Sequence, residues 1–131
     1  MAEGEARRAD AKPGGLEHLK SPSIFNWEAV DEEWRALFRE YIPAGMYSRE
    51  VLDQRTRELC AVAALTVLNY QGQLARHLLS ALDRGATRQE LVEVILQMSV
   101  YGGFPATSTA LSTLKGVLDQ VDQAAAAERE A

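Results

Sequence analysis

The sequence predicts a small all-α domain of about five to six helices, which assembles into an oligomer. Apolar residues recur every three or four positions through segments long enough to form helices. Short segments that contain asparagine, glycine or proline separate these helices and are expected to end them. One central segment is apolar on every side, and a chain of 131 residues is too small to bury such a helix by itself.

The first helix is expected to begin near Asn26, which is a good N-cap residue, and to end before Pro43 and Gly45. Its apolar face is expected to lie in the core, because aromatic residues at helical spacing are usually buried. This face consists of Trp27, Val30, Trp34, Leu37, Phe38 and Tyr41.

The second helix is predicted from about Asp53 to Leu68, and it is apolar over most of its surface. The third begins near Tyr70 or Gln73 and ends at Gly85, a glycine in the position of a C-cap. One stripe of this third helix is leucine-rich. A second stripe is polar, carries no charge except on His77, and therefore suits the lining of a cleft.

Thr87 and Glu90 form a capping box that begins the fourth helix. Apolar side chains of this helix point in every direction, so neighbouring subunits are expected to cover it in a trimer or hexamer. The polar positions of this helix form one stripe: Glu90, Glu93, Gln97 and Tyr101. We expect Glu93, Gln97 and Tyr101 to line the cleft together with Tyr70 and Gln73 of the third helix. A fifth helix is predicted over residues 106–121.

Composition narrows the possible functions. A net charge of −5 argues against nucleic acid as a partner, and a single cysteine excludes an intramolecular disulfide or a multi-cysteine metal site. No apolar run reaches the roughly 18 residues that a membrane span needs. The N-terminus lacks the apolar segment of a signal peptide, so we expect a cytoplasmic protein.

Three segments are expected along the chain. Residues 1–23 contain little to bury and are expected to form a flexible N-terminal arm. Residues 24–121 form the helical domain, and residues 122–131 form a charged tail that continues the last helix as a fraying end.

The candidate catalytic pair is Glu58 and His77, because both are titratable and lie in apolar helices. In an antiparallel hairpin, Glu58 lies roughly 6–7.5 Å along the axis from the level of His77, at 1.5 Å per residue. Side chains or one water molecule can bridge that distance. The alternative, a solvated Glu58 near the helix start, is equally compatible with the periodicity.

The order of motifs resembles the carboxymuconolactone decarboxylase family, which is related to the alkylhydroperoxidase D proteins. The matching segments are residues 47–59, 73–97 and 100–106. The resemblance implies an alkylhydroperoxidase D-like helical fold, subunits assembled into rings or hexamers, and the catalytic use of Glu58 and His77.

The resemblance also separates two kinds of chemistry. The peroxidase branch of the family has a Cys-x-x-Cys pair, but this chain has Tyr70 and Gln73 at those positions. Dithiol peroxide reduction needs two thiols, and Cys60 is expected to be a buried, inert residue. The decarboxylase branch usually has a glutamate at the position of Gln73, so the identity of the substrate stays open.

The resemblance therefore implies a carboxy-lyase that acts on a small carboxylated lactone or a related enolisable acid. No metal or organic cofactor is needed, because the conjugated ring accepts the electrons. His77 is expected to act as general acid or hydrogen-bond donor, and Glu58 to orient it or relay its proton. Arg49 or Arg57 would bind substrate carboxylates, with Arg55 and Arg76 as weaker candidates. Each arginine can also be an ordinary surface charge.

Two other functions stay open at this point. The chain could be a redox enzyme like the peroxidase branch, which the absent cysteine pair disfavours. It could also be a helical oligomer that binds a small ligand without catalysis. Only the retained Glu58 and His77 separate this last possibility from the lyase.

Overall fold

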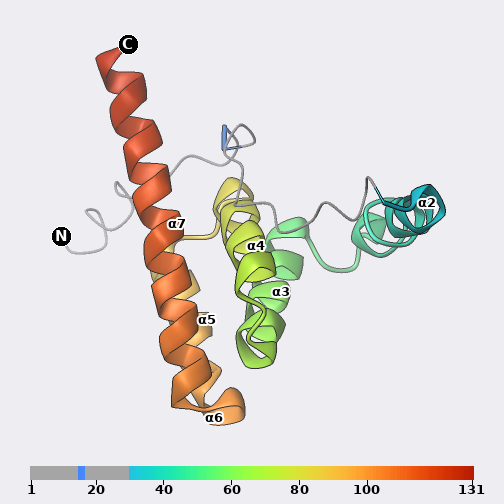
Figure 1. Cartoon of the computed structure of the whole chain (residues 1–131), viewed down its shortest axis with the longest axis horizontal. Helices are drawn as coiled ribbons and strands as arrows, with labels where there is room; N and C mark the ends of the chain where they lie inside the picture. The colour runs from blue at the N-terminus through green and yellow to red at the C-terminus, as the bar shows by residue number, and fades with distance from the viewer. Residues whose placement is uncertain (1–14, 17–29) are drawn as a thin grey trace.

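The structure is a computed structural model that describes residues 15–16 and 30–131. The secondary structure in these residues is entirely helical, which confirms the predicted all-α fold (Figure 1). The elements in order are α2 (Glu32–Tyr41), the 3₁₀ helix η2 (Met46–Ser48), α3 (Gln54–Leu68), α4 (Gln71–Asp83), α5 (Arg88–Gln97), α6 (Ser99–Gly102) and α7 (Phe104–Glu130). None of the described helices is long and apolar enough to cross a membrane.

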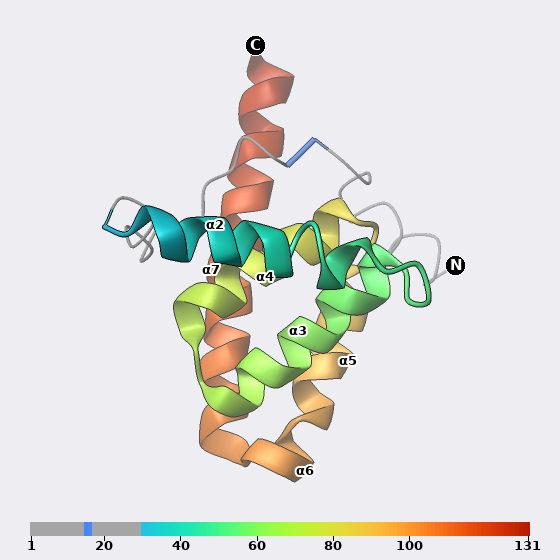
Figure 2. The ribbon, with the colours of Figure 1, turned by 90° about the vertical axis from the view of Figure 1, so that its right-hand side faces the viewer.

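The core lies where α3, α4, α5 and α7 pack side by side (Figure 2). The helix α4 contributes most to this core through its leucine stripe, as its periodicity predicts. The fully buried large residues are Leu74, Leu78, Leu82, Leu91, Ile95, Val62 and Thr66. One face of α4 is therefore fixed in the core, and its opposite side is left to carry polar groups.

The turn between α3 and α4 determines how these two helices face each other. Asp53 caps α3 by accepting a hydrogen bond from the Thr56 amide at 2.7 Å. Asn69 ends α3 in the left-handed conformation, with φ of 60°, which asparagine tolerates better than most residues. The chain then reverses directly into α4, so the predicted helical hairpin is confirmed.

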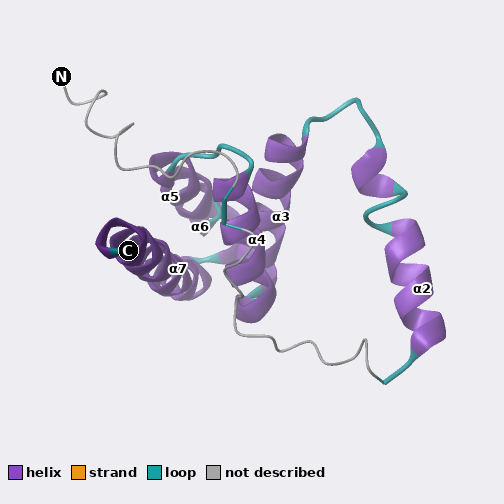
Figure 3. Ribbon diagram, turned by 90° about the horizontal axis from the view of Figure 1, so that it is seen from above, coloured by secondary structure: helices purple, strands orange, loops and turns teal. Residues whose placement is uncertain are grey.

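The helix α2 lies apart from the four packed helices, as Figures 1 and 3 show. It begins at Glu32, after Asp31 has capped it, and not at Asn26 as predicted. Asn26 and Trp27 lie outside the described residues, as do His18 and nearly all of the N-terminal arm. Leu16, one of the two described arm residues, donates its amide to Asp83 Oδ1 at 3.2 Å and packs against the core.

The apolar face of α2 is not in the core of this chain, so that prediction is wrong for the single subunit. Trp34 is 59% exposed and Tyr41 is 68% exposed. Periodicity identifies which face of a helix is apolar, but it does not identify what covers that face.

The capping box of Thr87 and Glu90 is present at the start of α5, as predicted. The helix was expected to continue through Tyr101, but it ends at Gln97 and is followed by the short α6. Leu91 and Ile95 are buried, whereas Val100 is 78% exposed. The side of α5 that carries Leu91 and Ile95 therefore packs in the core, whereas the apolar surface at Val100 of α6 is not covered by any described part of the chain.

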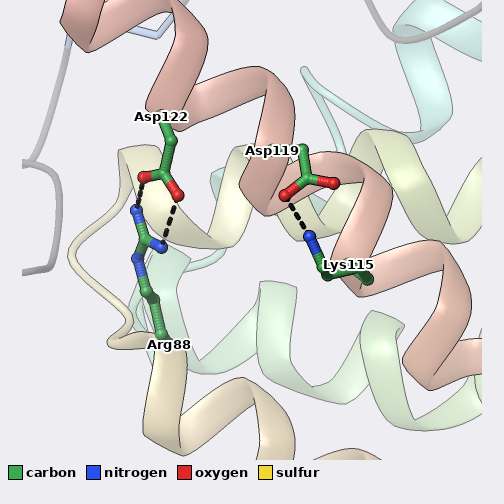
Figure 4. A network of polar contacts seen from close by, with 4 residues as sticks. All are labelled: Arg88, Lys115, Asp119 and Asp122. Carbon is green, nitrogen blue, oxygen red and sulfur yellow. Dashed lines mark hydrogen bonds and ion pairs between the residues drawn. The ribbon is translucent and has the colours of Figure 1, made fainter.

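The last helix, α7, continues beyond Val121 to Glu130. Arg88 at the start of α5 forms a two-bond ion pair with Asp122, and Lys115 pairs with Asp119 on α7 itself (Figure 4). The Arg88–Asp122 pair joins α5 to the last third of α7.

Candidate functional site

Glu58 and His77 are in direct contact. Glu58 Oε2 lies 2.6 Å from His77 Nδ1, which is within the range of a short, charge-assisted hydrogen bond. The Glu58 side chain is 7% exposed and that of His77 is 19% exposed. A carboxylate so well buried is stabilised only when it has a hydrogen-bonding partner, and the histidine is that partner.

The hairpin explains why two residues 19 positions apart meet. The helix α3 ends at Leu68 and α4 begins at Gln71, so the tight turn at Asn69 determines which residues of the two helices lie opposite each other. The offset expected along the helix axis was compatible with a water bridge. The side chains instead meet directly, with no water between Glu58 Oε2 and His77 Nδ1.

The contacts of the imidazole indicate which nitrogen carries the proton. Arg76 Nη2 lies 3.4 Å from His77 Nε2, and a guanidinium can only donate hydrogen bonds. Nε2 is then the acceptor, and Nδ1–H donates to Glu58. In this tautomer Nε2 has the lone pair of the ring, so Nε2 is the atom that can take up and return a proton.

The pair lies in the wall of a cavity of about 340 Å³. Three segments supply this wall, namely the end of α2 with its following loop, the start of α3, and one face of α4. The lining residues are Phe38, Ile42, Pro43, Tyr47, Glu58, Arg76, His77, Ser80 and Arg84.

The charges of this lining differ from those of the protein as a whole. The net charge of the chain is −5. Among the described residues of the wall, the charged groups are one carboxylate, Glu58, and the two guanidinium groups of Arg76 and Arg84. Guanidinium groups in the wall of a cavity suit an anionic ligand.

Tyr47 belongs to the loop that closes one side of the cavity. Its amide donates to the Ile42 carbonyl at 2.8 Å, and its carbonyl accepts from the Gln54 side chain of α3. Burial raises the pKa of the Tyr47 phenol, and the negative charge of Glu58 adds to this effect, while Arg76 opposes it. The phenol therefore stays protonated at neutral pH.

Several cavity residues were absent from the sequence prediction, or were ranked low in it. Arg76 was a weaker candidate, and Tyr47, Ser80 and Arg84 were not proposed. A signal for two of them was present, because Ser80 and Arg84 follow His77 at three and seven residues and so share its helix face. Tyr47 had no such signal, since its position depends on how a loop folds back.

Other predicted site residues lie elsewhere. Tyr70 is exposed at the start of α4, and neither it nor Gln73 lines the cavity. Glu93, Gln97 and Tyr101 are exposed on α5 and α6, away from the cavity. Of the two helices predicted to line the cleft with their polar stripes, only α4 contributes residues to the cavity, and α5 contributes none of the residues in its wall.

The two arginines proposed as carboxylate ligands have other positions. Arg49 lines a neighbouring hollow of about 580 Å³ beside α2. Arg57 donates from Nη2 to the Arg49 carbonyl at 2.9 Å, so it fastens the loop after η2 to α3. Arg55, a weaker candidate, pairs with Glu90.

Cys60 is exposed, and the prediction of a buried cysteine is wrong. It lies two residues after Glu58 and so falls on a different face of α3. It is absent from the cavity wall. Within residues 15–16 and 30–131, no three His, Cys, Asp or Glu residues gather closely enough to hold a metal ion.

Comparison with known proteins agrees with this arrangement. Residues 32–116, well over half of the chain, match the profile of the Carboxymuconolactone decarboxylase family. The chain belongs to the carboxymuconolactone decarboxylase family. The matched region contains both Glu58 and His77 and extends through most of the helical body, so the predicted resemblance is confirmed.

Two relatives of the chain differ in how much of it they cover. The chain is 30% identical over 97 residues to the 4-carboxymuconolactone decarboxylase of Acinetobacter baylyi, covering 74% of this chain and 72% of that protein. It is 42% identical over 82 residues to an uncharacterized 15.0 kDa protein of the nqo9–nqo10 intergenic region of Paracoccus denitrificans. That match covers 59% of each protein, so the chain spans less than two thirds of that relative.

Proposed function

We propose that this protein is a cofactor-free carboxy-lyase that acts on a small carboxylated lactone or a related enolisable acid. The observation that carries the proposal is the Glu58–His77 hydrogen bond of 2.6 Å in the wall of a cavity that also holds Arg76 and Arg84. The similarity to 4-carboxymuconolactone decarboxylase supports the same reaction class.

The reaction needs one proton carrier and one electron sink. The carbon–carbon bond to the substrate carboxylate breaks, CO₂ leaves, and the bonding electron pair moves through the conjugated system onto the substrate carbonyl oxygen. His77, protonated at Nε2, gives this proton to the carbanionic carbon, which forms the new C–H bond. Water then restores the proton on Nε2, and the hydroxide left behind combines with the released CO₂ as bicarbonate. Glu58 holds Nδ1–H and stabilises the imidazolium while His77 carries the second proton.

Arg76 and Arg84 are the cationic groups best placed to bind substrate carboxylates. They stand eight residues apart on α4, on either side of Ser80, and all three line the cavity. Guanidinium groups bind carboxylates through two parallel hydrogen bonds. A carboxylate held there lies beside the imidazole, since Arg76 is adjacent to His77 in the chain and reaches Nε2.

The assay follows the loss of carboxymuconolactone by ultraviolet absorbance, with no added metal or thiol. Exchanging His77 for alanine should lower kcat by about 10²–10⁴-fold, the usual contribution of a positioned acid–base group. Arg84→Gln should raise KM, because it removes one carboxylate ligand. Arg129→Gln is the matched control, since Arg129 is exposed near the free end of α7 and should leave both constants unchanged.

The outcomes separate the site from the substrate. Wild-type protein that is inert on this lactone, but turns over another enolisable acid through His77, would mean that the site is right and the substrate wrong. A His77→Ala variant as active as wild type on the substrate found would remove the mechanism.

The assembly we propose is a homo-oligomer, most simply a trimer or hexamer. Two uncovered apolar surfaces support it: the face of α2 with Trp34, Leu37 and Tyr41, and the surface of α5 and α6 with Leu96 and Val100. These surfaces belong to separate parts of the chain, with α3 between α2 and the pair α5 and α6 (Figure 3). Light scattering that gave a stable monomer of 14.4 kDa at micromolar concentration would refute this assembly.

A further inference from the structure

Tyr47 is the uncharged phenol of the cavity wall, and the carboxy-lyase mechanism above leaves it without a role. Tyr47 lines the same cavity as Glu58, Arg76 and His77. From the part of the chain that the structure describes, only the backbone of Tyr47 has a hydrogen-bond partner. The hydroxyl is therefore available to a ligand in the cavity.

The loop that carries Tyr47 is held in place from α3. Gln54 donates to the Tyr47 carbonyl, and Arg57 donates to the Arg49 carbonyl at 2.9 Å, so α3 holds the segment at Tyr47 itself and two residues after it. Within the loop, Ser48 Oγ donates to the Ala44 carbonyl at 2.8 Å. A Cβ on Gly45 would overlap the Tyr41 carbonyl oxygen, so a glycine is needed for the chain to turn back at that point.

We propose that the Tyr47 hydroxyl donates a hydrogen bond to the oxyanion that develops on the substrate carbonyl as CO₂ leaves. This inference rests on the carboxy-lyase function proposed above. The hydroxyl keeps its proton throughout, so the step adds no bond and needs no further reactant. The charge that forms on the substrate oxygen is stabilised by a donor already in position.

The chemistry of the wall distinguishes Tyr47 from its neighbours. Arg76 and Arg84 are permanently charged, so they bind the carboxylate of the ground state as well as the oxyanion. His77 is needed at the carbon that receives the proton. A neutral phenol interacts weakly with an uncharged carbonyl and more strongly with an oxyanion, so its contribution grows toward the transition state.

The test is Tyr47→Phe, which removes only the hydroxyl. On the substrate of the lyase reaction, kcat should fall by about 10²-fold, as for other single oxyanion donors, while KM changes by less than about threefold. Tyr70→Phe is the matched control, because Tyr70 is exposed at the start of α4 and does not line this cavity. A kcat within twofold of wild type for Tyr47→Phe would overturn the inference.

A binding experiment judges Tyr47 without relying on turnover. The probes are 4-nitrophenolate, which presents an oxyanion, and benzoate, which presents only a carboxylate. Tyr47→Phe should weaken 4-nitrophenolate binding by about tenfold, the loss expected for one hydrogen bond to a charged group. Benzoate binding should change by less than about twofold, whereas Arg84→Gln should weaken benzoate binding.

The two experiments fail in different ways. In one outcome the wild type decarboxylates none of the substrates, while Tyr47→Phe binds 4-nitrophenolate more weakly and benzoate as before. In that case the proposed reaction is wrong, and Tyr47 as an oxyanion donor stands. If the wild type is an active lyase and both probes bind Tyr47→Phe as they bind wild type, the function stands and Tyr47 is not the donor.

A third experiment tests the loop that holds Tyr47. Arg57→Gln removes the hydrogen bond from Arg57 to the Arg49 carbonyl. This change should lower kcat when Tyr47 is present but have little further effect in the Tyr47→Phe variant.

Discussion

The hydrogen bond between Glu58 and His77 should be measurable as a coupling free energy in protein stability. The perturbation is a double-mutant cycle made of His77→Ala, Glu58→Gln and the double variant. His77→Ala leaves a carboxylate with a 7%-exposed side chain without its partner. Breaking a buried pair costs about 3–5 kcal/mol, but the open cavity lets water reach Glu58, so we expect about 2 kcal/mol.

The expected losses for Glu58→Gln and for the double variant follow from the same hydrogen bond. In Glu58→Gln the amide oxygen still accepts from Nδ1–H, so the loss is confined to the charge and should be about 1 kcal/mol. In the double variant no buried charge remains. Its loss should be about 2 kcal/mol, not the sum of about 3 kcal/mol, which leaves a coupling of about 1 kcal/mol.

The assay is urea unfolding followed by far-ultraviolet circular dichroism at one fixed protomer concentration, because the proposed assembly would make stability depend on concentration. Typical domains have about 5–15 kcal/mol of stability, so each variant should still fold. Pairing Glu58→Gln with Lys115→Ala, which lies on exposed α7 surface, is the additive control. Losses for the cycle that add to within about 0.3–0.5 kcal/mol would refute the bond in solution.

Two further predictions concern groups outside this pair. Cys60→Ser should keep turnover within about twofold of wild type, because Cys60 is exposed and absent from the cavity wall; complete loss of activity in a folded variant would favour a redox enzyme. The hydrogen bond from Arg88 lowers the pKa of Asp122 below its ordinary 3.8, so its stabilisation is present above that value and is lost as the pH falls through the folded pKa. Since Asp122 is 58% exposed, Asp122→Asn should cost only about 0.5 kcal/mol of unfolding free energy at pH 7. Urea titrations at neutral and acid pH should show this difference shrinking in acid, and a difference that grew in acid would contradict the assigned pairing.

The sequence alone determined the features that depend on neighbours in the chain. The cap at Asp53, the capping box of Thr87 and Glu90, and the helix-ending glycine at Gly85 were predicted, and the structure contains them. The reason is that a helix end is decided by hydrogen bonds within about one turn of the chain. The contact of Glu58 with His77 was predicted as one of two alternatives, because a short turn brings the two helices together but the periodicity equally allowed a solvated Glu58.

Only the tertiary structure decided which surfaces face one another. Tyr47 reaches the cavity because its loop folds back onto α3, and Arg84 enters the wall because the loop and the end of α2 close over that face of α4. Cys60 is exposed and α2 lies outside the core, although apolar patterns in the sequence favoured burial of both. A hydrophobic pattern gives the direction of an apolar face, but burial also depends on contacts between distant segments, which no local pattern contains.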